Sequence, residues 1–357
     1  MSLLQTMTYT EYVKAKDFPL EKCEKIARMA GLSITFTNTT TPGELLMKEL
    51  DRIGFTPKKF AKLIAFSNVK MPLTYYKPQA KVAILVANDN YMHVSKLVTP
   101  SIDCDSIGMK LKDLGFVVVT IKNTTSCIFK EILKQVCNLI PEDSYAFLFY
   151  AGHGCQICNT KCLLSIDCPK EDIQYEHCIT ENYILNVLER CKLDLCVFIM
   201  DMCGVHLDRT INPQIYESMT HVEQYSVHKN LLISNSCQSA ESAYEVLQIE
   251  CTNSIDSAKT FPMSKYKGRI VPVASQYVNA LCTRIFENLD VSSLLDKVHA
   301  DVEKSVKKQK PFKSQCGVDK RSLHDPVLGN TQELFSKLQE ISKTFSEYCV
   351  VFYGWNR

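Results

Sequence analysis

The sequence lacks a charge excess of either sign. It has 41 lysine and arginine residues against 39 acidic residues, so the formal net charge is only +2. Such a balance gives no overall field that would attract nucleic acid or an anionic membrane, and we expect neither as a partner. The basic run KSVKKQK near Lys304 has no interleaved aromatic residues and is typical of a solvated helix end.

Long apolar runs are also missing. The N-terminal segment has no unbroken apolar stretch of signal-peptide length, and runs such as Leu195–Met200 are far too short to cross a membrane. With 46% hydrophobic and 22% charged residues among 357, the chain can nevertheless bury a sizeable core. These features predict a cytoplasmic protein with no membrane segment.

Cysteine, in contrast, is abundant. The 17 cysteines are an odd number, and several fall within apolar patterns, where a thiol packs as a small hydrophobic group. A chain this long needs no disulfide framework, so we expect reduced thiols. Cys155 and Cys158 have the spacing of zinc ligands, but no second pair repeats it. We predict no metal and no organic cofactor.

The first 75 residues contain short amphipathic segments separated by glycine and proline. These segments are Leu20–Ala30, Pro42–Leu50 and Pro57–Phe66. A small helical module over residues 1–75 is the simplest interpretation. Its stretch LLMKELDRIGFTPKKFAKLIAF is similar to the end of a death domain, a helical module that assembles with its own kind. An unspecialised helical extension is the alternative.

After a proline-containing linker, the pattern changes to alternating strands and helices. Apolar runs rich in β-branched residues recur at Val82–Ala87, Phe116–Ile121, Tyr145–Tyr150, Leu195–Met200 and Leu231–Ser234. Between them, apolar residues three and four apart predict helices over Asp103–Leu114, Cys127–Ile140 and Glu181–Cys191. This alternation predicts an α/β fold in which helices sandwich a mostly parallel sheet.

Two loops with reactive side chains follow predicted strands, AGHG after Tyr145–Tyr150 and DMCG after Leu195–Met200. In a parallel sheet, ligands bind beyond the carboxyl ends of the strands. A thiol cleaves an amide when a histidine takes its proton and backbone N–H groups stabilise the oxyanion. His153 and Cys203 could form that pair, with the N–H groups of Gly154 and Cys203 as the oxyanion hole.

Both residues also have an ordinary structural interpretation, a packed cysteine and a loop histidine. Their separation of 50 residues is that of caspases, although DMCGV departs from the caspase signature Q-A-C-[RQG]-G. Taken alone, these residues leave the catalytic and the structural interpretations open.

Four motifs occur in order after KVAILVANDNY: FLFYAGHG, VFIMDMC, SCQSAE and KRSLHDPVLG. Together they resemble the caspase-like domain of the metazoan paracaspases, the mucosa-associated lymphoid tissue lymphoma translocation protein family. The resemblance implies a caspase-like peptidase domain over residues 79–330, with His153 and Cys203 as its catalytic dyad. It also implies activation by homodimerisation through this domain and a role in intracellular signalling of the NF-κB kind.

The chain departs from this family at both ends. Family members usually place immunoglobulin-like modules beside the peptidase domain, whereas residues 1–78 lack a strand-rich pattern with cysteine and tryptophan. The tail over residues 331–357 predicts an amphipathic helix, Glu333–Phe345, and an apolar strand, CVVFY. It is either a remnant of a further module or a strap packed on the peptidase domain.

The resemblance further implies cleavage after arginine, whose permanent charge requires a carboxylate cluster. Asp103, Asp201 and Glu245 correspond to the family's acidic pocket, and Glu241 competes with Glu245 for the third position. Asp103 could instead cap the following helix, and either glutamate could be a solvated charge. Asp201 ends an apolar strand and needs a partner, which a substrate cation would supply.

The predicted function is therefore a cysteine endopeptidase that cleaves protein substrates after a basic residue. Cys203 attacks the scissile carbonyl, His153 protonates the leaving amine, and water hydrolyses the thioester. A non-enzymatic signalling adaptor, whose helical module recruits death-domain-type partners, is the alternative from another class. An Asp-specific caspase and a metacaspase-like peptidase, often calcium dependent, are the enzymatic alternatives.

Overall fold

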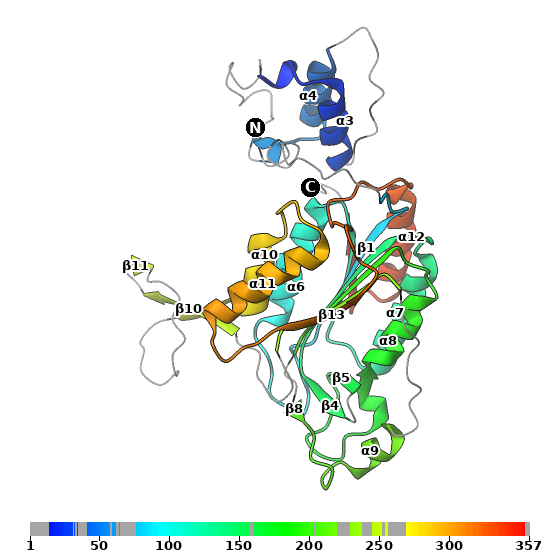
Figure 1. Cartoon of the computed structure of the whole chain (residues 1–357), viewed down its shortest axis with the longest axis vertical. Coiled ribbons are helices and arrows are strands. Elements are labelled where there is room, and N and C mark those ends of the chain that lie inside the picture. The colour runs from blue at the N-terminus through cyan, green and yellow to red at the C-terminus, as the bar shows by residue number, and fades with distance from the viewer. Residues whose placement is uncertain are drawn as a thin grey trace.

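A seven-stranded sheet forms the centre of the computed structural model (Figure 1). Its strands lie in the order β13-β9-β7-β3-β1-β2-β14. In chain order they are β1 Lys81–Ala87, β2 Val117–Lys122, β3 Tyr145–Ala151, β7 Leu195–Asp201, β9 Leu231–Asn235, β13 Phe312–Cys316 and β14 Cys349–Phe352. The structure describes residues 14–30, 32, 34, 41–57, 59–61, 64, 76–157, 160–202, 205–219, 229–237, 245–251, 254–255 and 269–353.

The inner strands of this sheet are parallel, and both outer strands are antiparallel to their neighbours. Strands β9, β7, β3, β1 and β2 run in one direction, whereas β13 pairs with β9 and β14 with β2 in the opposite sense. The parallel strands are the five predicted from apolar runs, each displaced by at most one residue at either end. The predicted α/β fold is therefore confirmed.

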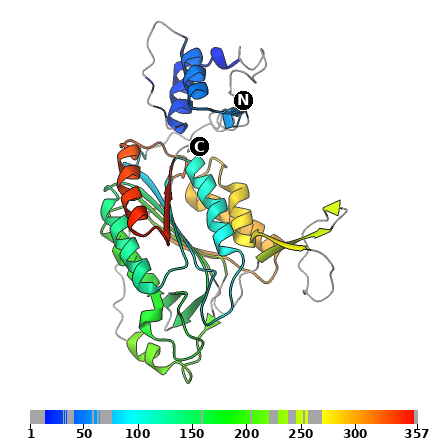
Figure 2. The same cartoon turned by 180° about the vertical axis from the view of Figure 1, so that it is seen from behind.

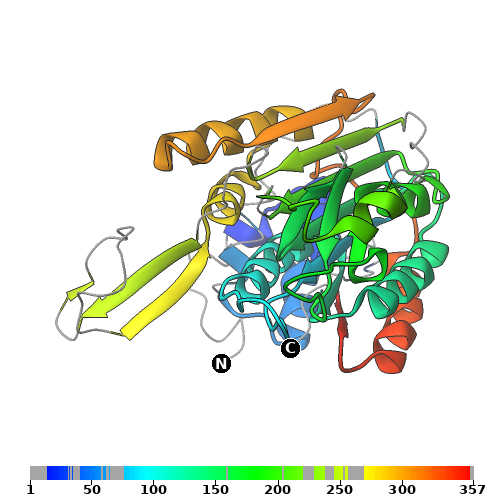
Figure 3. The same cartoon turned by 90° about the horizontal axis from the view of Figure 1, so that it is seen from below.

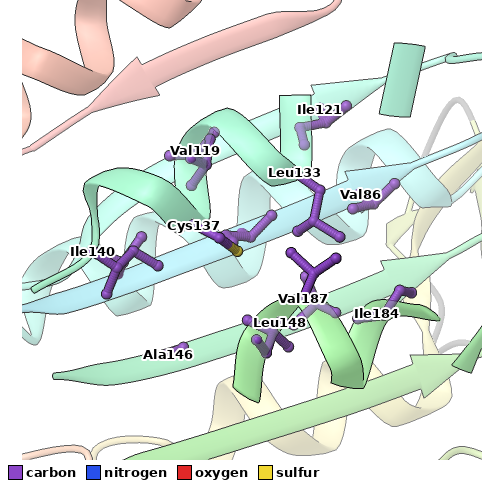
Figure 4. Packing of buried hydrophobic residues seen from close by; sticks show 14 of the residues in the cluster. Val86, Val119, Ile121, Leu133, Cys137, Ile140, Ala146, Leu148, Ile184 and Val187 are labelled. Carbon is purple, nitrogen blue, oxygen red and sulfur yellow. The ribbon is translucent and has the colours of Figure 1, made fainter. Parts of the chain in front are cut away.

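Helices cover both faces of the sheet (Figures 1 and 2). One face carries α6 Pro100–Asp113, α10 Gln276–Arg284 and α11 Val291–Ser305, and the other carries α7 Ser126–Leu139, α8 Glu181–Glu189 and α12 Thr331–Thr344. Figure 4 shows side chains of α7 and α8, among them Leu133 and Val187, packed onto Val119 and Leu148. Because both faces are buried, the strands are apolar without alternation.

Helix α6 begins earlier than its apolar pattern predicts. It starts at Pro100, whose fixed φ suits the first helical position, and not at Asp103. Asp103 therefore lies inside the first turn, where its side chain is 1% exposed, and it does not cap the helix. The capping alternative considered for Asp103 is wrong.

A buried lysine closes the amino-terminal end of the sheet. The Lys81 Nζ donates to the carbonyl oxygens of Leu323 and Asp325, both at 3.0 Å, and lies 5.1 Å from the centre of the Phe116 ring. Burial lowers the pKa of Lys81 to about 7, an effect that Asp325 partly opposes. The Tyr145 hydroxyl also donates to Asp325, at 2.6 Å. Residues after α11 thus complete this end of the fold.

Two smaller sheets adjoin the central one. The first has the order β6-β5-β4-β8, with β4 Gly154–Ile157, β5 Thr160–Leu164, β6 Cys178–Thr180 and β8 Val205–His206. The second joins β10 Glu245–Cys251 to β11 Ser254–Ile255 and β12 Arg269–Ser275 and projects from the body (Figures 1 and 3). Short elements η1 Tyr175–His177 and α9 Pro213–Met219 complete this region.

The two ends of the chain differ in their relation to the core. Helices α3 Leu20–Met29 and α4 Pro42–Arg52 match two of the predicted helices and bury their own cluster, including Cys23, Ile26, Leu46 and Leu50. The predicted Pro57–Phe66 helix lies partly outside the described residues. In the tail, β14 extends the central sheet and α12 packs with α7, which favours the strap over the module remnant.

No helix in the described part of the chain is long and apolar enough to cross a membrane.

Candidate active site

The chain segments that flank the two loops singled out in the sequence are paired at the carboxyl ends of the strands. Ala151 of β3 pairs with Asp201 of β7, and Cys155 of β4 pairs with Val205 of β8. Residues 203 and 204 lie outside the described residues, so the distance from the Cys203 sulfur to His153 stays a prediction. The segments on both sides of Cys203 are nevertheless in register with those on both sides of His153.

Gly154 provides a close approach between these loops. A Cβ atom added at Gly154 would lie 2.1 Å from the sulfur and 2.9 Å from Cγ of Met202, the residue before Cys203. No side chain fits at that distance unless Met202 moves. The glycine therefore lets the histidine loop pack directly against the loop that leads to the predicted nucleophile.

Two tyrosine hydroxyls fix the backbone of His153. Its N–H donates to the Tyr91 hydroxyl oxygen at 2.7 Å, and its carbonyl oxygen accepts from the Tyr150 hydroxyl, also at 2.7 Å. The carbonyl accepts as well from the Leu164 N–H at 3.0 Å, and the Tyr91 hydroxyl donates to the Leu164 carbonyl at 3.3 Å. The Tyr91 hydroxyl thus links the His153 N–H to the Leu164 carbonyl, two groups that would otherwise bond to each other directly.

These hydroxyls are buried and stay protonated. Burial raises the pKa of Tyr91 and the pKa of Tyr150, and the two oxygens lie 3.3 Å apart. They also account for Gly152, because an added Cβ there would lie 2.5 Å from the Tyr150 oxygen and 2.8 Å from the Tyr91 oxygen. The glycine before the histidine is required by this packing.

The His153 imidazole has a defined tautomer. Its Nε2 lies 2.7 Å from the carbonyl oxygen of Ser95, which can only accept, so Nε2 carries the proton. The ring centroid lies 4.5 Å from that of Tyr91. In the neutral ring Nδ1 is then the basic nitrogen, able to accept a proton from a thiol.

Two of the three predicted pocket acids meet at one serine. The Ser275 N–H donates to Oδ1 of Asp103 at 2.8 Å, and its hydroxyl donates to Oδ2 of Asp201 at 2.5 Å. Asp103 is 1% exposed and Asp201 6% exposed. In the β10–β12 ladder, Ser275 pairs with Glu245. Helix α6, strand β7 and the β10–β12 ribbon thus bring all three predicted positions to the same place.

The remaining predicted residues are less fully defined. The Glu245 backbone belongs to β10, but the structure does not describe its side chain, and Glu241 and Cys203 lie outside the described residues. The choice between Glu241 and Glu245 therefore stays open.

Three thiols lie close together beside the histidine loop. Cys155 pairs with Cys162 across β4 and β5, and both interact with Cys178 of β6. Each is at most 1% exposed. Hydrogen bonds with Cys162 and Cys178, together with burial, raise the pKa of Cys155. The contact with Cys155 lowers the pKa of Cys178, but the contact with Cys162 and burial outweigh it and raise that pKa. Within the described residues, no group of three or more potential ligands is arranged to hold a metal ion. These thiols pack as core.

Three residues of the site were not identified from the sequence. Tyr91 stands within KVAILVANDNY, a motif that gave the resemblance but no role for the tyrosine. Ser95 acts through its backbone carbonyl, which any residue could supply. Ser275 is 172 residues from Asp103 in sequence, and no local pattern links them.

Comparisons with known proteins show the family of this chain. A family model described as the caspase domain matches residues 80–322. The chain belongs to the caspase-domain family. The match covers the central sheet from β1 to β13 and both loops of the site, and it confirms a caspase-family peptidase domain.

The curated relatives of this caspase-domain chain are paracaspases. It is 26% identical over 253 residues to the mucosa-associated lymphoid tissue lymphoma translocation protein 1 of Homo sapiens, covering 70% of the chain and 27% of that protein. It is 26% identical over 300 residues to the homolog of Mus musculus, covering 83% of the chain and 31% of the homolog. The chain thus spans less than a third of the length of these relatives. The resemblance predicted from the four motifs is confirmed, and the protein is paracaspase-like.

Among solved structures, caspase-1 from Spodoptera frugiperda is 15% identical to this chain. Its TM-score is 0.48, and the alignment covers 72% of this chain and 95% of the insect chain.

Proposed function

We propose that this protein is a cysteine endopeptidase in which Cys203 is the nucleophile and His153 the general base. One observation carries the proposal. The segments flanking Cys203 are paired with those flanking His153, at Ala151 with Asp201 and at Cys155 with Val205. This register supports the proposal, because the chain on both sides of Cys203 pairs with the chain on both sides of His153 at the end of the sheet where ligands of parallel sheets bind.

The geometry around His153 suits a base that later acts as an acid. With Nε2–H held by the Ser95 carbonyl, Nδ1 takes the thiol proton, and the same contact stabilises the imidazolium that forms. The thiolate attacks the scissile carbonyl, and Nδ1 returns the proton to the leaving amine. Water then hydrolyses the thioester, again with proton transfer to His153.

Gly154 is positioned to stabilise the oxyanion. The Leu164 N–H donates to the His153 carbonyl, which makes His153 and Leu164 a hydrogen-bonded pair between the two segments. Hydrogen-bonded and non-hydrogen-bonded pairs alternate along an antiparallel ladder, so the next pair, Gly154 and Leu163, is non-hydrogen-bonded. The Gly154 N–H therefore points away from β5. It faces the side on which β8 pairs, and together with the Cys203 N–H it forms the proposed oxyanion hole.

Arginine before the scissile bond fits the acidic residues best. Asp103 and Asp201 are both buried and both bonded to Ser275, at the N-terminus of helix α10. The helix dipole attracts negative charge to this position. Two fixed carboxylates are matched by the planar guanidinium of arginine, and the Glu245 backbone pairs with Ser275 in the β10–β12 ladder.

The proposed active form is a homodimer through the peptidase domain. Strand β13 is the outermost strand on one side of the central sheet, and all its residues except Lys313 are exposed. An exposed edge strand can pair with that of a second copy.

By resemblance, the proposal extends to cytoplasmic signalling of the NF-κB kind, with death-domain-type adaptors bound by the helical module of residues 1–75.

Peptide cleavage tests the function directly. Fluorogenic peptides ending in arginine, lysine or aspartate should be assayed with and without calcium, using the wild type and Cys203→Ala. We expect cleavage after arginine without calcium and none by the mutant. Cleavage after aspartate would favour a caspase, and calcium-dependent cleavage after arginine and lysine would favour a metacaspase-like enzyme. No cleavage by a wild-type dimer enforced by a fused dimerisation tag would favour the adaptor.

A further inference from the structure

Ser275 contacts both buried acids through two different groups. Its backbone N–H bonds Asp103 and its hydroxyl bonds Asp201, while the hydroxyl oxygen accepts from the Val278 N–H at 3.1 Å. The last contact makes Ser275 the N-cap of α10. The residue is 5% exposed and ends β12, opposite Glu245. Its position is therefore fixed by a strand end and a helix start at once.

We propose that Ser275 is a positioning residue that sets the selectivity of this site for arginine over lysine. The inference rests on the proposed cleavage after a basic residue. A guanidinium presents a rigid, planar set of donors, so binding it well requires acceptors that are fixed in distance and direction. An ammonium is a compact charge with rotatable donors and makes weaker demands on geometry.

The two contacts of Ser275 supply that fixed geometry. Asp103 comes from helix α6 and Asp201 from strand β7, which β3 separates from β1 in the sheet. Neither backbone alone therefore sets the spacing of the two carboxyl groups. One serine that bonds both carboxylates links them through a few covalent bonds. Without the hydroxyl, Asp201 loses the bond that orients its Oδ2, whereas the backbone bond to Asp103 remains.

The experiment compares kcat/KM for peptides that differ only in arginine or lysine before the cleaved bond. The variants are Ser275→Ala, Ser275→Thr, which keeps a hydroxyl, and Thr180→Ala. Thr180 caps α8 by accepting from the Tyr183 N–H at 3.1 Å, the same contact that Ser275 makes with Val278. Thr180→Ala therefore reproduces the loss of a helix cap without a contact to either acid.

We expect Ser275→Ala to lower the arginine-to-lysine ratio of kcat/KM about tenfold or more, because a hydrogen bond to a charged group is lost. Ser275→Thr should restore most of the ratio, and Thr180→Ala should lower the melting temperature but leave the ratio unchanged. An unchanged ratio in Ser275→Ala, or an equal fall in Thr180→Ala, would overturn the role of Ser275 and leave the proposed function intact. A wild type that cleaves after neither residue would overturn both.

Discussion

At the residue scale, the conformation of His153 depends on a tyrosine distant in sequence. Tyr91 lies 62 residues before His153, yet its hydroxyl joins the His153 N–H to the Leu164 carbonyl and its ring lies against the imidazole. The histidine is thus held by its backbone through Tyr91 and Tyr150, and by its ring through Ser95. Such support from residues outside the proposed catalytic pair would keep a base in a productive orientation.

Tyr91→Phe tests this support. The change leaves the His153 N–H and the Leu164 carbonyl without their shared partner, at a cost of about 1–3 kcal/mol in unfolding free energy. We expect kcat to fall by about tenfold or more, because His153 loses one of its backbone anchors. Tyr145→Phe is the control, since its hydroxyl bonds Asp325 at the other end of the sheet. An equal fall in kcat in both variants would contradict a specific role for Tyr91.

Asp201→Asn tests the charge of the proposed pocket. Asparagine keeps the size of the side chain and can still accept from the Ser275 hydroxyl, so the fold should persist. Loss of one carboxylate from a buried guanidinium site costs about 2–5 kcal/mol, and kcat/KM for arginine peptides should fall at least about 30-fold. Asp105→Asn, on the same helix as Asp103 but exposed and paired with Lys122, should change it little. Full activity of Asp201→Asn would exclude the acid from the pocket.

The sequence motifs led to predictions for residues with a catalytic or charged side chain. They gave none for residues whose role is to hold another residue in place. His153 and Asp201 stand in motifs that resemble the family, and Asp103 and Glu245 were assigned by correspondence with its acidic pocket. Ser275 and Tyr91 act through hydroxyls that reach across the fold, and Ser95 acts through a carbonyl. Contacts between distant segments depend on tertiary packing, which no local pattern encodes.

At the element scale, the edge strands of the central sheet differ from its inner strands. Strand β13 carries Lys313, Ser314, Gln315 and Cys316 in succession, whereas every residue of β1 and β7 is buried. This exposed strand is the surface that a second copy would cover in the proposed dimer.

Gln315→Lys tests whether β13 is the dimer contact. Antiparallel pairing of two β13 strands about a twofold axis would bring the two introduced lysines close together, and like charges on paired strands are destabilising. We expect weaker self-association in analytical ultracentrifugation and a matching loss of activity at low protein concentration. Val350→Lys, on the opposite edge strand and 56% exposed, should leave both unchanged. Unaltered self-association of Gln315→Lys would place the contact elsewhere.

The sequence predicts the inner sheet well because its strands are long and uniformly apolar. The sheet of β4, β5, β6 and β8 was not predicted. Its strands have two to five residues, and β4, β5 and β6 each contain a cysteine, so neither length nor periodicity distinguishes them from loops. This sheet nonetheless holds Gly154 and sets the register beside Cys203.

At the scale of the whole molecule, the buried His299 and the half-buried His324 make stability depend on pH. Burial, with Lys313 adding to it, lowers the pKa of His299 to about 4, and burial together with Lys81 lowers the pKa of His324 to about 4. His299 contacts the Ser234 hydroxyl at 2.8 Å, inside a network that includes Tyr277. The folded protein keeps both rings neutral at a pH where the unfolded chain would protonate them.

Unfolding free energy should therefore fall as pH decreases from about 6.5 to 4. In that range the unfolded chain binds protons that the folded protein does not, so each histidine contributes a loss of up to about 3 kcal/mol. Urea unfolding at several pH values measures this decrease in unfolding free energy. His299→Gln should reduce the slope by about one proton, whereas the exposed His93→Gln should not. An identical slope in His299→Gln would show that this ring does not cause the effect.

The buried ammonium of Lys81 has a consequence for choosing recombinant fragments. The family match ends at residue 322, but the carbonyl oxygens that accept from Lys81 belong to Leu323 and Asp325. In a fragment cloned to the match boundary, the Lys81 amine at the amino-terminal end of the sheet would lack both carbonyl acceptors. Such a fragment should accumulate in inclusion bodies. Extending the fragment through β14 should return it to the soluble fraction, because the acceptors and the last strand are then both present.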